Sequence, residues 1–416
     1  MLYSRQDMTK IIVVGTGNYY KNFLAPSLSL LKKERLAEVL ATLSRERGDI
    51  NKPDFFSRTE HVARTVKEQL SSLFADFQSE KTIIVLSHVN DLHTPDAADL
   101  IKHNFKVIIE KPYCINQSQL RVLQGLVRNN PRKIGLLEYY LLMKSSPLLI
   151  LAGKIKKNSF YFQKKGLLKI YSGLYQFAQD LKNFSGRLKE LIGEPKSVLV
   201  DLLEGEGMTG RLDHRGPHLS DLRQGGGMIQ DLGLHAISPL LVLEDYLGQI
   251  DDSFEKGEVR IARCREYLQM ARKKFKIPEK YIGETYAEFS FTTAKKIPIR
   301  IAVGKYTPDN KNQRRIIIEG SRSRVHLDLN SCTLFLLTEK KSEIKTLEIP
   351  KAPEFKYYPV LRATLEALVG RNPFYFDATS AALKAQSFIL NVLKKAYSKK
   401  DKIPLYPAGA LPQNIF

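Results

Sequence analysis

The sequence predicts two folded parts of different class: an α/β domain built on a doubly wound parallel sheet, followed by an α+β domain with a largely antiparallel, open sheet. Short apolar runs alternate with helix-like segments up to about residue 145, whereas consecutive short strands dominate beyond residue 195. The 416 residues also exceed the size at which a single core stops growing, roughly 250 to 300 residues. We therefore expect one domain over residues 8–145 and a second over residues 146–416.

The N-terminal part alternates between two kinds of hydrophobic period. Runs of β-branched apolar residues predict strands, and apolar residues spaced three or four apart predict helices. Strands joined by helices in this way lie parallel, with right-handed crossovers. The expected strands cover residues 11–17, 39–43, 82–87, 106–110 and 133–140, and the expected helices cover residues 22–35, 61–77, 95–103 and 117–128.

The C-terminal part lacks this alternation. Its strand-like segments follow one another across short turns or charged breaks, which favours antiparallel pairing. Two regions near residues 150–195 and 250–282 are expected to be helical and are rich in lysine, and no motif assigns them a role. The expected strands cover residues 196–203, 285–292, 297–303, 315–319, 324–329, 333–337 and 344–349, and a closing helix covers residues 379–397.

The chain is strongly basic. Its 65 lysines and arginines against 44 aspartates and glutamates give a net charge of +21, which slightly favours an anionic substrate and says nothing about the fold. A local excess of basic residues at 154–190 is interpreted first as a solvated helical surface. No zinc spacing, recognition helix or aromatic-rich basic sheet accompanies the charge, so we expect no nucleic-acid partner.

Cysteine usage and hydropathy indicate a cytoplasmic protein. The three cysteines have neither CxxC spacing nor an even count, so we expect no disulfide framework and no metal site. The polar first ten residues run straight into the first apolar strand, and we identify no signal peptide. The longest apolar stretch, residues 136–152, is interrupted by Glu138, Lys144 and Pro147, so we expect no membrane span.

A glycine-rich turn lies between the first expected strand and the first helix. Gly15 permits a tight turn and Gly17 lets backbone amides approach a pyrophosphate, so these residues and Asn18 are candidate cofactor ligands of a Rossmann domain. Tyr20 stands where the dinucleotide fingerprint has its third glycine, which predicts a different loop or looser packing of helix on strand. Alone, the motif also fits an ordinary turn that ends a strand.

The end of the second strand favours NADP over NAD. An acidic residue at this point would bind the ribose hydroxyls of NAD, but the sequence continues as Ser44-Arg45-Glu46-Arg47. A hydroxyl beside two guanidinium groups suits a 2′-phosphate, because the planar guanidinium pairs well with phosphate oxygens. Ser44, Arg45 and Arg47 are therefore candidate ligands of NADP, with NAD as the alternative cofactor; an exposed charged turn would give the same sequence.

A glutamate-lysine-proline motif follows the strand expected at 106–110. With its flanks, over residues 86–114, this motif resembles the most recognisable stretch of the glucose-fructose oxidoreductase / inositol dehydrogenase (Gfo/Idh/MocA) family. In that family the motif ends a Rossmann strand, and its lysine reaches the nicotinamide and the substrate hydroxyl. The resemblance thus implies that Glu110 and Lys111 bind the cofactor and that Lys111 is catalytic.

The loop before this motif matches the family in part. Asn90 and His93 fall where the family carries asparagine and histidine, and with Ser87 they are implied to bind the cofactor. His88 and Val89 stand in place of the usual small residue and proline.

A second match covers residues 225–241, with Asp231 and His235 at the family's functional positions. If this segment is helical, a spacing of four puts both side chains on one face, so both can point into one cleft. A capping pair or half of a metal site would show the same spacing. The resemblance spans nearly the whole chain in order, from the glycine turn to the terminal helix.

The family resemblance implies hydride transfer between a nicotinamide and a secondary hydroxyl or keto group of a sugar, sugar derivative or cyclitol. His235 would move the hydroxyl proton, since an imidazole titrates near neutral pH. Lys111 would stabilise the developing alkoxide, and Asp231 would orient the histidine or a neighbouring hydroxyl. Tyr139 and Tyr140, at the end of an expected strand, are further candidates for the cleft.

Two alternative functions share this fold. One is a non-catalytic nucleotide-binding sensor or regulator, which we would expect to have lost Lys111 or His235. The other is a glycosidase that recycles a bound NAD. Family members usually assemble through the sheet of the second domain, which would otherwise expose a broad apolar surface, so the resemblance implies a homodimer or homotetramer.

Overall fold

The computed structural model separates the chain into two compact units. Unit 1 comprises Met1–Glu138 and Lys351–Pro373, and unit 2 comprises Tyr139–Pro350 and Phe374–Phe416. This division differs from the predicted one, since residues 139–145 belong to unit 2 and a segment late in the chain belongs to unit 1. The described residues are 8–17, 19–44, 59–61, 82–155, 185–205, 219–308, 313–338, 345–348, 357–370, 374–398 and 402–410.

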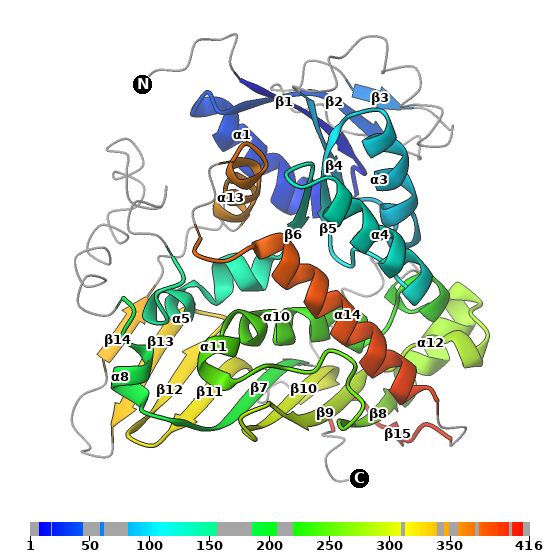
Figure 1. The fold of residues 1–416 in the computed structure, drawn as a ribbon. Helices are drawn as coiled ribbons and strands as arrows, with labels where there is room; N and C mark the ends of the chain where they lie inside the picture. Colours follow the sequence, from blue (N-terminus) through cyan, green and yellow to red (C-terminus); the bar gives the residue numbers. More distant parts are fainter. Residues whose placement is uncertain are drawn as a thin grey trace. The chain divides into compact units, whose positions relative to one another are not determined.

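Unit 1 is built on a parallel sheet of order β3-β2-β1-β4-β5-β6, which confirms the predicted doubly wound fold. Helices α1 and α13 cover one face and α3 and α4 the other, so the central strands are apolar on both sides (Figure 1). The strands are β1 (Thr9–Val14), β2 (Ala37–Ser44), β3 (Thr59–His61), β4 (Thr82–Leu86), β5 (Lys106–Glu110) and β6 (Ile134–Leu137), and the helices are α1 (Ala25–Lys33), α3 (His93–Lys102), α4 (Gln117–Asn129) and α13 (Tyr358–Leu368).

The helix predicted at 61–77 lies outside the described residues, except that its first residue, His61, ends β3. Helix α4 begins where its pattern predicts, because Asn116 caps it by accepting a hydrogen bond from the Gln119 amide at 2.9 Å. Local capping of this kind can be read from sequence.

A buried ion pair attaches α13 to unit 1. Arg362 Nη1 lies 2.8 Å from Glu34 Oε2, and the Tyr358 hydroxyl donates to the same carboxylate. The side chains of Arg362 and Glu34 are only 9% and 16% exposed. A Cβ on Gly135 of β6 would come within 2.6 Å of the Thr364 methyl group, so α13 packs directly on the strand. These contacts explain why a segment far along the chain folds with the N-terminal unit.

We predict that Arg362→Met strongly destabilises unit 1. The substitution leaves the buried Glu34 carboxylate without its cation, which typically costs about 3–5 kcal/mol. The control is Arg272→Met, which breaks the pair with Glu279 whose side chains are 59% and 53% exposed, and exposed pairs contribute about 0–1 kcal/mol. Urea unfolding measures both changes, and equal losses in the two variants would contradict the prediction.

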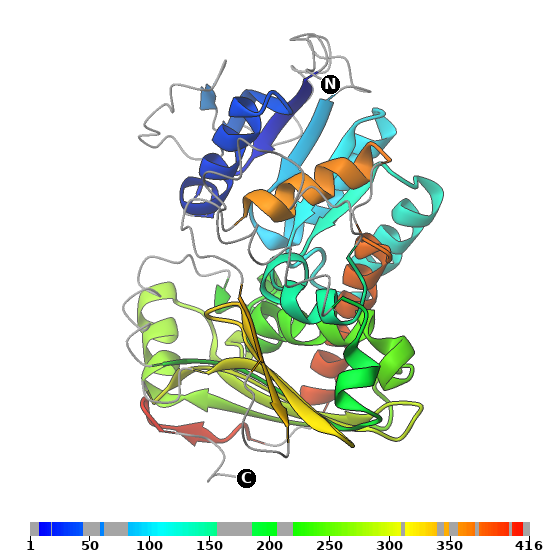
Figure 2. The same cartoon turned by 90° about the vertical axis from the view of Figure 1, so that its left-hand side faces the viewer.

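Unit 2 is built on a sheet of order β14-β13-β12-β11-β7-β10-β9-β8-β15. Only the pairs β7–β10 and β8–β15 are parallel, which confirms the largely antiparallel prediction. Helices α10 and α14 lie on one face of the sheet (Figures 1 and 2). The strands are β7 (Pro195–Gly205), β8 (Glu258–Cys264), β9 (Tyr286–Thr292), β10 (Pro298–Thr307), β11 (Arg314–Gly320), β12 (Ser323–Asp328), β13 (Thr333–Thr338), β14 (Lys345–Glu348) and β15 (Leu405–Tyr406).

In the described part of unit 2, α12 and α14 are the longest helices. The final helix starts at a strong cap, since Asp377 accepts hydrogen bonds from the amides of Thr379 and Ser380. The helices are α5 (Ser146–Leu151), α8 (Leu188–Ile192), α10 (Leu234–Val242), α11 (Glu244–Leu247), α12 (Arg265–Phe275) and α14 (Ala378–Ala396).

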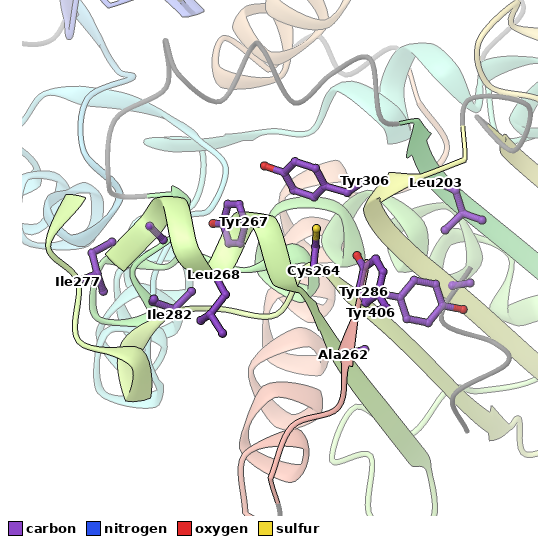
Figure 3. Packing of buried hydrophobic residues seen from close by; sticks show 12 residues of the cluster. Leu203, Ala262, Cys264, Tyr267, Leu268, Ile277, Ile282, Tyr286, Tyr306 and Tyr406 are labelled. Atoms are coloured by element: carbon purple, nitrogen blue, oxygen red, sulfur yellow. The ribbon is translucent and has the colours of Figure 1, made fainter. Parts of the chain in front are cut away.

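The prediction that residues 250–282 are helical is wrong in part, because residues 258–264 form the strand β8. Helix α12 follows this strand, and its apolar face joins β8, β9 and β15 in a buried cluster (Figure 3). Tyr267 and Leu268 of α12 contribute to this cluster together with Tyr286 of β9 and Tyr406 of β15. The lysine-rich region therefore closes one end of the core of unit 2.

The face of the unit 2 sheet opposite α10 and α14 carries paired charges. Arg315 Nε lies 2.8 Å from Asp201 Oδ2, and Arg300 Nη2 lies 2.5 Å from Glu288 Oε2. Among the described residues, the large apolar side chains that are clearly exposed are Val122, Val369, Tyr375 and Leu405. Leu199, Ile317 and Phe335 are partly exposed on neighbouring strands, and assembly through this sheet stays a prediction. In the part of the chain that the structure describes, no helix has the length and apolar character needed to cross a membrane.

Candidate functional site

The glycine turn lies at the topological switch point of the unit 1 sheet. Strand β1 pairs with β2 on one side and β4 on the other, and open parallel sheets bind ligands where the strand order reverses. Gly15 has φ +103°, and a Cβ on it would lie 2.7 Å from the His88 amide nitrogen. A Cβ on Gly17 would meet no atom within 4 Å. The turn therefore needs glycine at 15, and its backbone is open at 17.

Tyr20 changes the helix that follows the turn. Residues Tyr20–Leu24 form a π-helical turn, η2, before α1 begins, and Tyr20 is only 2% exposed. The wider turn buries a tyrosine where the fingerprint has a glycine. That the loop, or the packing of helix on strand, differs from the glycine fingerprint stays a prediction.

Ser87 braces the glycine turn. Its hydroxyl donates to the carbonyl oxygens of Val14 and Gly15, at 3.2 Å and 3.0 Å. Its amide also donates to Val14, at 2.9 Å. Ser87 thus joins the ends of β1 and β4, and its predicted contact with the cofactor stays a prediction.

The start of α3 holds the loop that carries Lys111. His93 Nδ1 lies 2.8 Å from the Pro112 carbonyl oxygen, and the Thr94 hydroxyl donates to the Tyr113 carbonyl at 2.9 Å. Burial, with a smaller effect of His88, lowers the pKa of His93 to about 3, so its ring is neutral. We conclude that His93 positions the lysine loop, while Lys111 itself is half-buried. Asn90 is buried in the preceding turn.

Glu110 is a buried acid beside Lys111. Burial raises the pKa of Glu110 to about 8, although the hydrogen bond from Tyr19 and the charge of Lys111 lower it; Glu138 raises it further. Glu110 is therefore mainly protonated at neutral pH, and it does not neutralise the lysine with a full negative charge.

We predict that Glu110 makes stability fall as pH rises. Its folded pKa of about 8 exceeds the ordinary value of 4.5, so its contribution is complete below about pH 4.5 and is lost as pH rises through about 8. Glu110→Gln should remove this slope. At pH 8 its free energy of unfolding should exceed that of the wild type by on the order of a few kcal/mol, so it should unfold at a higher denaturant concentration. The control Glu255→Gln, at an exposed position, should keep the wild-type slope. Parallel slopes in wild type and Glu110→Gln would contradict this account.

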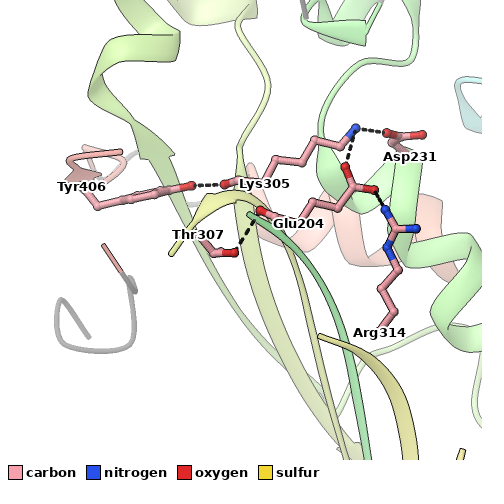
Figure 4. Close-up of polar contacts among 6 residues, drawn as sticks. All are labelled: Glu204, Asp231, Lys305, Thr307, Arg314 and Tyr406. Carbon is pink, nitrogen blue, oxygen red and sulfur yellow. Dashed lines mark hydrogen bonds and ion pairs between the residues drawn. The ribbon is translucent and has the colours of Figure 1, made fainter. Parts of the chain in front are cut away.

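Asp231 lies in a buried charge network of unit 2 (Figure 4). Lys305 Nζ, on β10, lies 2.7 Å from Asp231 Oδ2 and 3.7 Å from Glu204 Oε2. Arg314 Nη2 lies 2.5 Å from Glu204 Oε1. The Lys305 and Glu204 side chains are 5% and 6% exposed, and Asp231 is 12% exposed. Asp231 is thus held by a lysine from a neighbouring strand.

His235 follows Asp231 across a change of helix type. Asp231 lies in a π-helical turn, η10 (Ile229–Gly233), and His235 lies in the first turn of α10. The His235 ring is stacked on Tyr140, with centroids 4.2 Å apart and planes inclined by 22°. His235 is 5% exposed, so the tyrosine fixes an imidazole that is almost enclosed.

Glu284 positions the start of the helix that carries these residues. Its Oε1 accepts a hydrogen bond from the Ile229 amide at 2.7 Å, and its Oε2 accepts one from the Tyr397 hydroxyl at 2.5 Å. A Cβ on Gly227 would lie 2.7 Å from this carboxylate, and one on Gly226 would lie 2.6 Å from the Asp221 amide nitrogen. The glycine run before Asp231 is therefore required by close approach.

Lys305 and Glu284 were not among the predicted site residues. A signal for Lys305 exists, because it is a lysine within the apolar strand IAVGKY, where charge is rarely buried without a partner. The signal for Glu284 is weaker, because the glycine run indicates only that some bulky group packs against its backbone.

Some of the remaining predicted site residues are described by the structure and some are not. Ser44 ends β2, whereas Asn18, Arg45 and Arg47 lie outside the described residues. Lys111 belongs to unit 1, and Asp231 and His235 belong to unit 2. Within the described ranges, no group of three His, Cys, Asp or Glu side chains could hold a metal ion.

We predict that Lys305→Met destabilises unit 2. It leaves Asp231 and Glu204 buried with less compensating charge, which typically costs about 3–5 kcal/mol. The double variant Lys305→Met/Asp231→Asn removes one of the stranded charges and should recover part of the loss. A double-mutant cycle in urea measures the coupling, and purely additive losses would show that the pair contributes nothing.

Unit 1 matches a known protein family. Residues 9–136 match the model described as "Oxidoreductase family, NAD-binding Rossmann fold", GFO_IDH_MocA. The match covers the part of unit 1 that carries the parallel sheet. The predicted family is thereby confirmed, and so is the predicted cofactor class, NAD or NADP. Residues 9–136 are thus similar to the NAD-binding domain of this oxidoreductase family.

Solved structures share the fold along nearly the whole chain. An oxidoreductase from Thermotoga maritima is 15% identical with a TM-score of 0.63, covering 94% of this chain and 97% of its own. A 3-ketoreductase from Actinomadura kijaniata, in complex with NADP and TDP-benzene, is 14% identical with a TM-score of 0.62, covering 96% and 100%. A biliverdin reductase from Synechocystis, in complex with biliverdin and NADP+, is 15% identical with a TM-score of 0.59, covering 93% and 98%. No curated protein matches the sequence.

The residues of unit 1 fit a dinucleotide. The backbone at Gly17 is open where a Cβ would stand, and Gly15 brings this turn against the end of β4. His88 Nδ1, at the end of β4, is buried and has no hydrogen-bond partner among the described residues. An open glycine backbone and an unsatisfied buried nitrogen at a switch point are features that a phosphate-bearing ligand would complete.

Proposed function

We propose that the protein transfers a hydride between NADP or NAD and a secondary hydroxyl or keto group of a sugar, sugar derivative or cyclitol. The observation that carries this proposal is the enclosed His235, stacked on Tyr140 in the helical turn that follows the ion-paired Asp231. An imidazole held in one orientation is suited to moving a proton.

Each side chain has a defined task in this reaction. The bound nicotinamide would supply or accept the hydride. His235 takes the hydroxyl proton in oxidation and returns it in reduction. Lys111 donates a hydrogen bond to the oxygen that gains charge. Asp231, whose position Lys305 sets, orients a substrate hydroxyl or the histidine.

We further propose NADP as the preferred cofactor, on the sequence Ser44-Arg45-Glu46-Arg47 after β2. The net charge of +21 favours an anionic substrate of the polyol or sugar type. We retain as proposals a homodimer or homotetramer and a cytoplasmic location, the latter consistent with the three buried free cysteines. Light scattering after size-exclusion chromatography tests the oligomer.

The first experiment is to identify the nucleotide. The purified protein is denatured, any released NAD or NADP is identified, and NADPH and NADH are titrated by fluorescence. Tighter binding of NADPH supports the cofactor preference. Failure of both nucleotides to bind contradicts the proposed function.

We predict that Lys111→Met and His235→Ala each lower kcat strongly. A positioned acid or base typically contributes ~100- to 10,000-fold to rate, so losses of this size are expected with the fold retained. Turnover is measured on a panel of polyols and sugar phosphates that the wild type oxidises. The control His103→Ala changes an exposed histidine and should leave turnover unaltered. Unchanged turnover in both site variants would remove the assignment.

A further inference from the structure

His88 follows β4 at the switch point and is held by an acid. Its Nε2 lies 2.5 Å from Asp96 Oδ2, with the two side chains 6% and 15% exposed. Asp96 lies in the first turn of α3, where the helix dipole favours a carboxylate. Asp96 therefore fixes the ring of His88 and one of its two nitrogens.

The other ring nitrogen lacks a partner. His88 Nδ1 is buried and makes no hydrogen bond with any of the residues that the structure describes. Buried polar atoms without partners are rare and unfavourable, so such an atom calls for a ligand. The backbone of His88 forms the wall against which Gly15 turns, which places the residue at the glycine loop.

Within the described ranges, the titratable side chains in contact with His88 are Asp96 and His93, both from α3. Asp96 contributes negative charge at Nε2. The His93 ring lies alongside, with centroids 5.1 Å apart, and it is neutral because burial lowers its pKa to about 3. The Asp96 carboxylate thus compensates a positive charge on the His88 ring, and the neutral His93 ring does not compete with it as a second cation.

We propose that His88 is a phosphate-binding residue of the cofactor site, whose Nδ1–H donates to a phosphate oxygen while Asp96 balances the charge of the ring. This inference rests on the proposed function. A neutral ring that donates Nε2–H to Asp96 presents a lone pair at Nδ1, which repels a phosphate oxygen. Because Nε2 already donates to Asp96, Nδ1 donates only when the ring is doubly protonated, so a ring that is neutral before binding takes up a proton when the phosphate binds.

The test measures proton uptake as well as affinity. Calorimetric titration of NADH is carried out between pH 6 and 8 in two non-phosphate buffers that differ in ionisation enthalpy. The wild type should take up a proton on binding and bind more tightly at lower pH. His88→Ala should abolish the uptake and weaken binding roughly ten- to hundredfold, the effect typical of a hydrogen bond to a charged group. His88→Asn, which keeps a neutral donor near Nδ1, should recover affinity without the proton uptake.

Two substitutions in α3 test the compensating charge, one at Asp96 and one at a control position. Asp96→Asn removes the compensating charge and should reduce both proton uptake and affinity. Asp99→Asn, on the same helix, should behave as the wild type. Thermal unfolding of each variant checks that the fold is retained.

Comparing ligands shows which phosphate of the cofactor His88 binds. Inorganic pyrophosphate and NADH both show the effect of His88→Ala if the bridging phosphates are bound, whereas only NADPH shows it if the 2′-phosphate is bound. If His88→Ala and wild type bind NADH, NADPH and pyrophosphate with equal affinity and equal proton uptake, the inference is overturned while the proposed function stands. If the wild type binds no nucleotide, the proposed function itself fails.

Discussion

The close approach of the first strand's turn to the end of β4 is the constraint on which the N-terminal unit depends. Gly15 leaves β1 with a positive φ, and its α-carbon faces the Ser87–His88 backbone so closely that no side chain fits. The Ser87 hydroxyl bridges the same two strand ends. Because β1 and β4 are neighbours at the switch point, this contact brings the glycine backbone and His88 into one place. Parallel sheet order thus creates the candidate phosphate site.

The protein handles its buried charge by local pairing. Although the chain carries an excess of 21 positive charges, Lys305 is enclosed with Asp231 and Glu204, and Arg362 is enclosed with Glu34. Glu110 is handled differently, because burial keeps it protonated beside Lys111. Each arrangement avoids an unpaired ion in a medium of low dielectric constant. The same pairing sets the positions of Asp231 and of helix α13.

Elements with strong local signals were predicted well. The buried strands β1, β4 and β5 read as continuous apolar runs, and α4 and α14 carry caps and amphipathic spacing. The strand β8 was missed although EVRIARC begins with the alternation typical of a strand, because it runs directly into the amphipathic, basic α12 and the whole region was interpreted as helical. Neither the membership of α13 in unit 1 nor the partners of Lys305, Glu284 and His88 follow from local pattern.

The sequence by itself determined the fold class, the glycine turn, the family and the positions of Lys111, Asp231 and His235, because these depend on periodicity and on short motifs. Only the tertiary structure decided what those residues touch. Lys305 reaches Asp231 from a strand far along the chain, Tyr140 covers His235, and Asp96 fixes His88. Contacts between distant segments depend on sheet order and packing, which the spacing of residues along one chain does not encode.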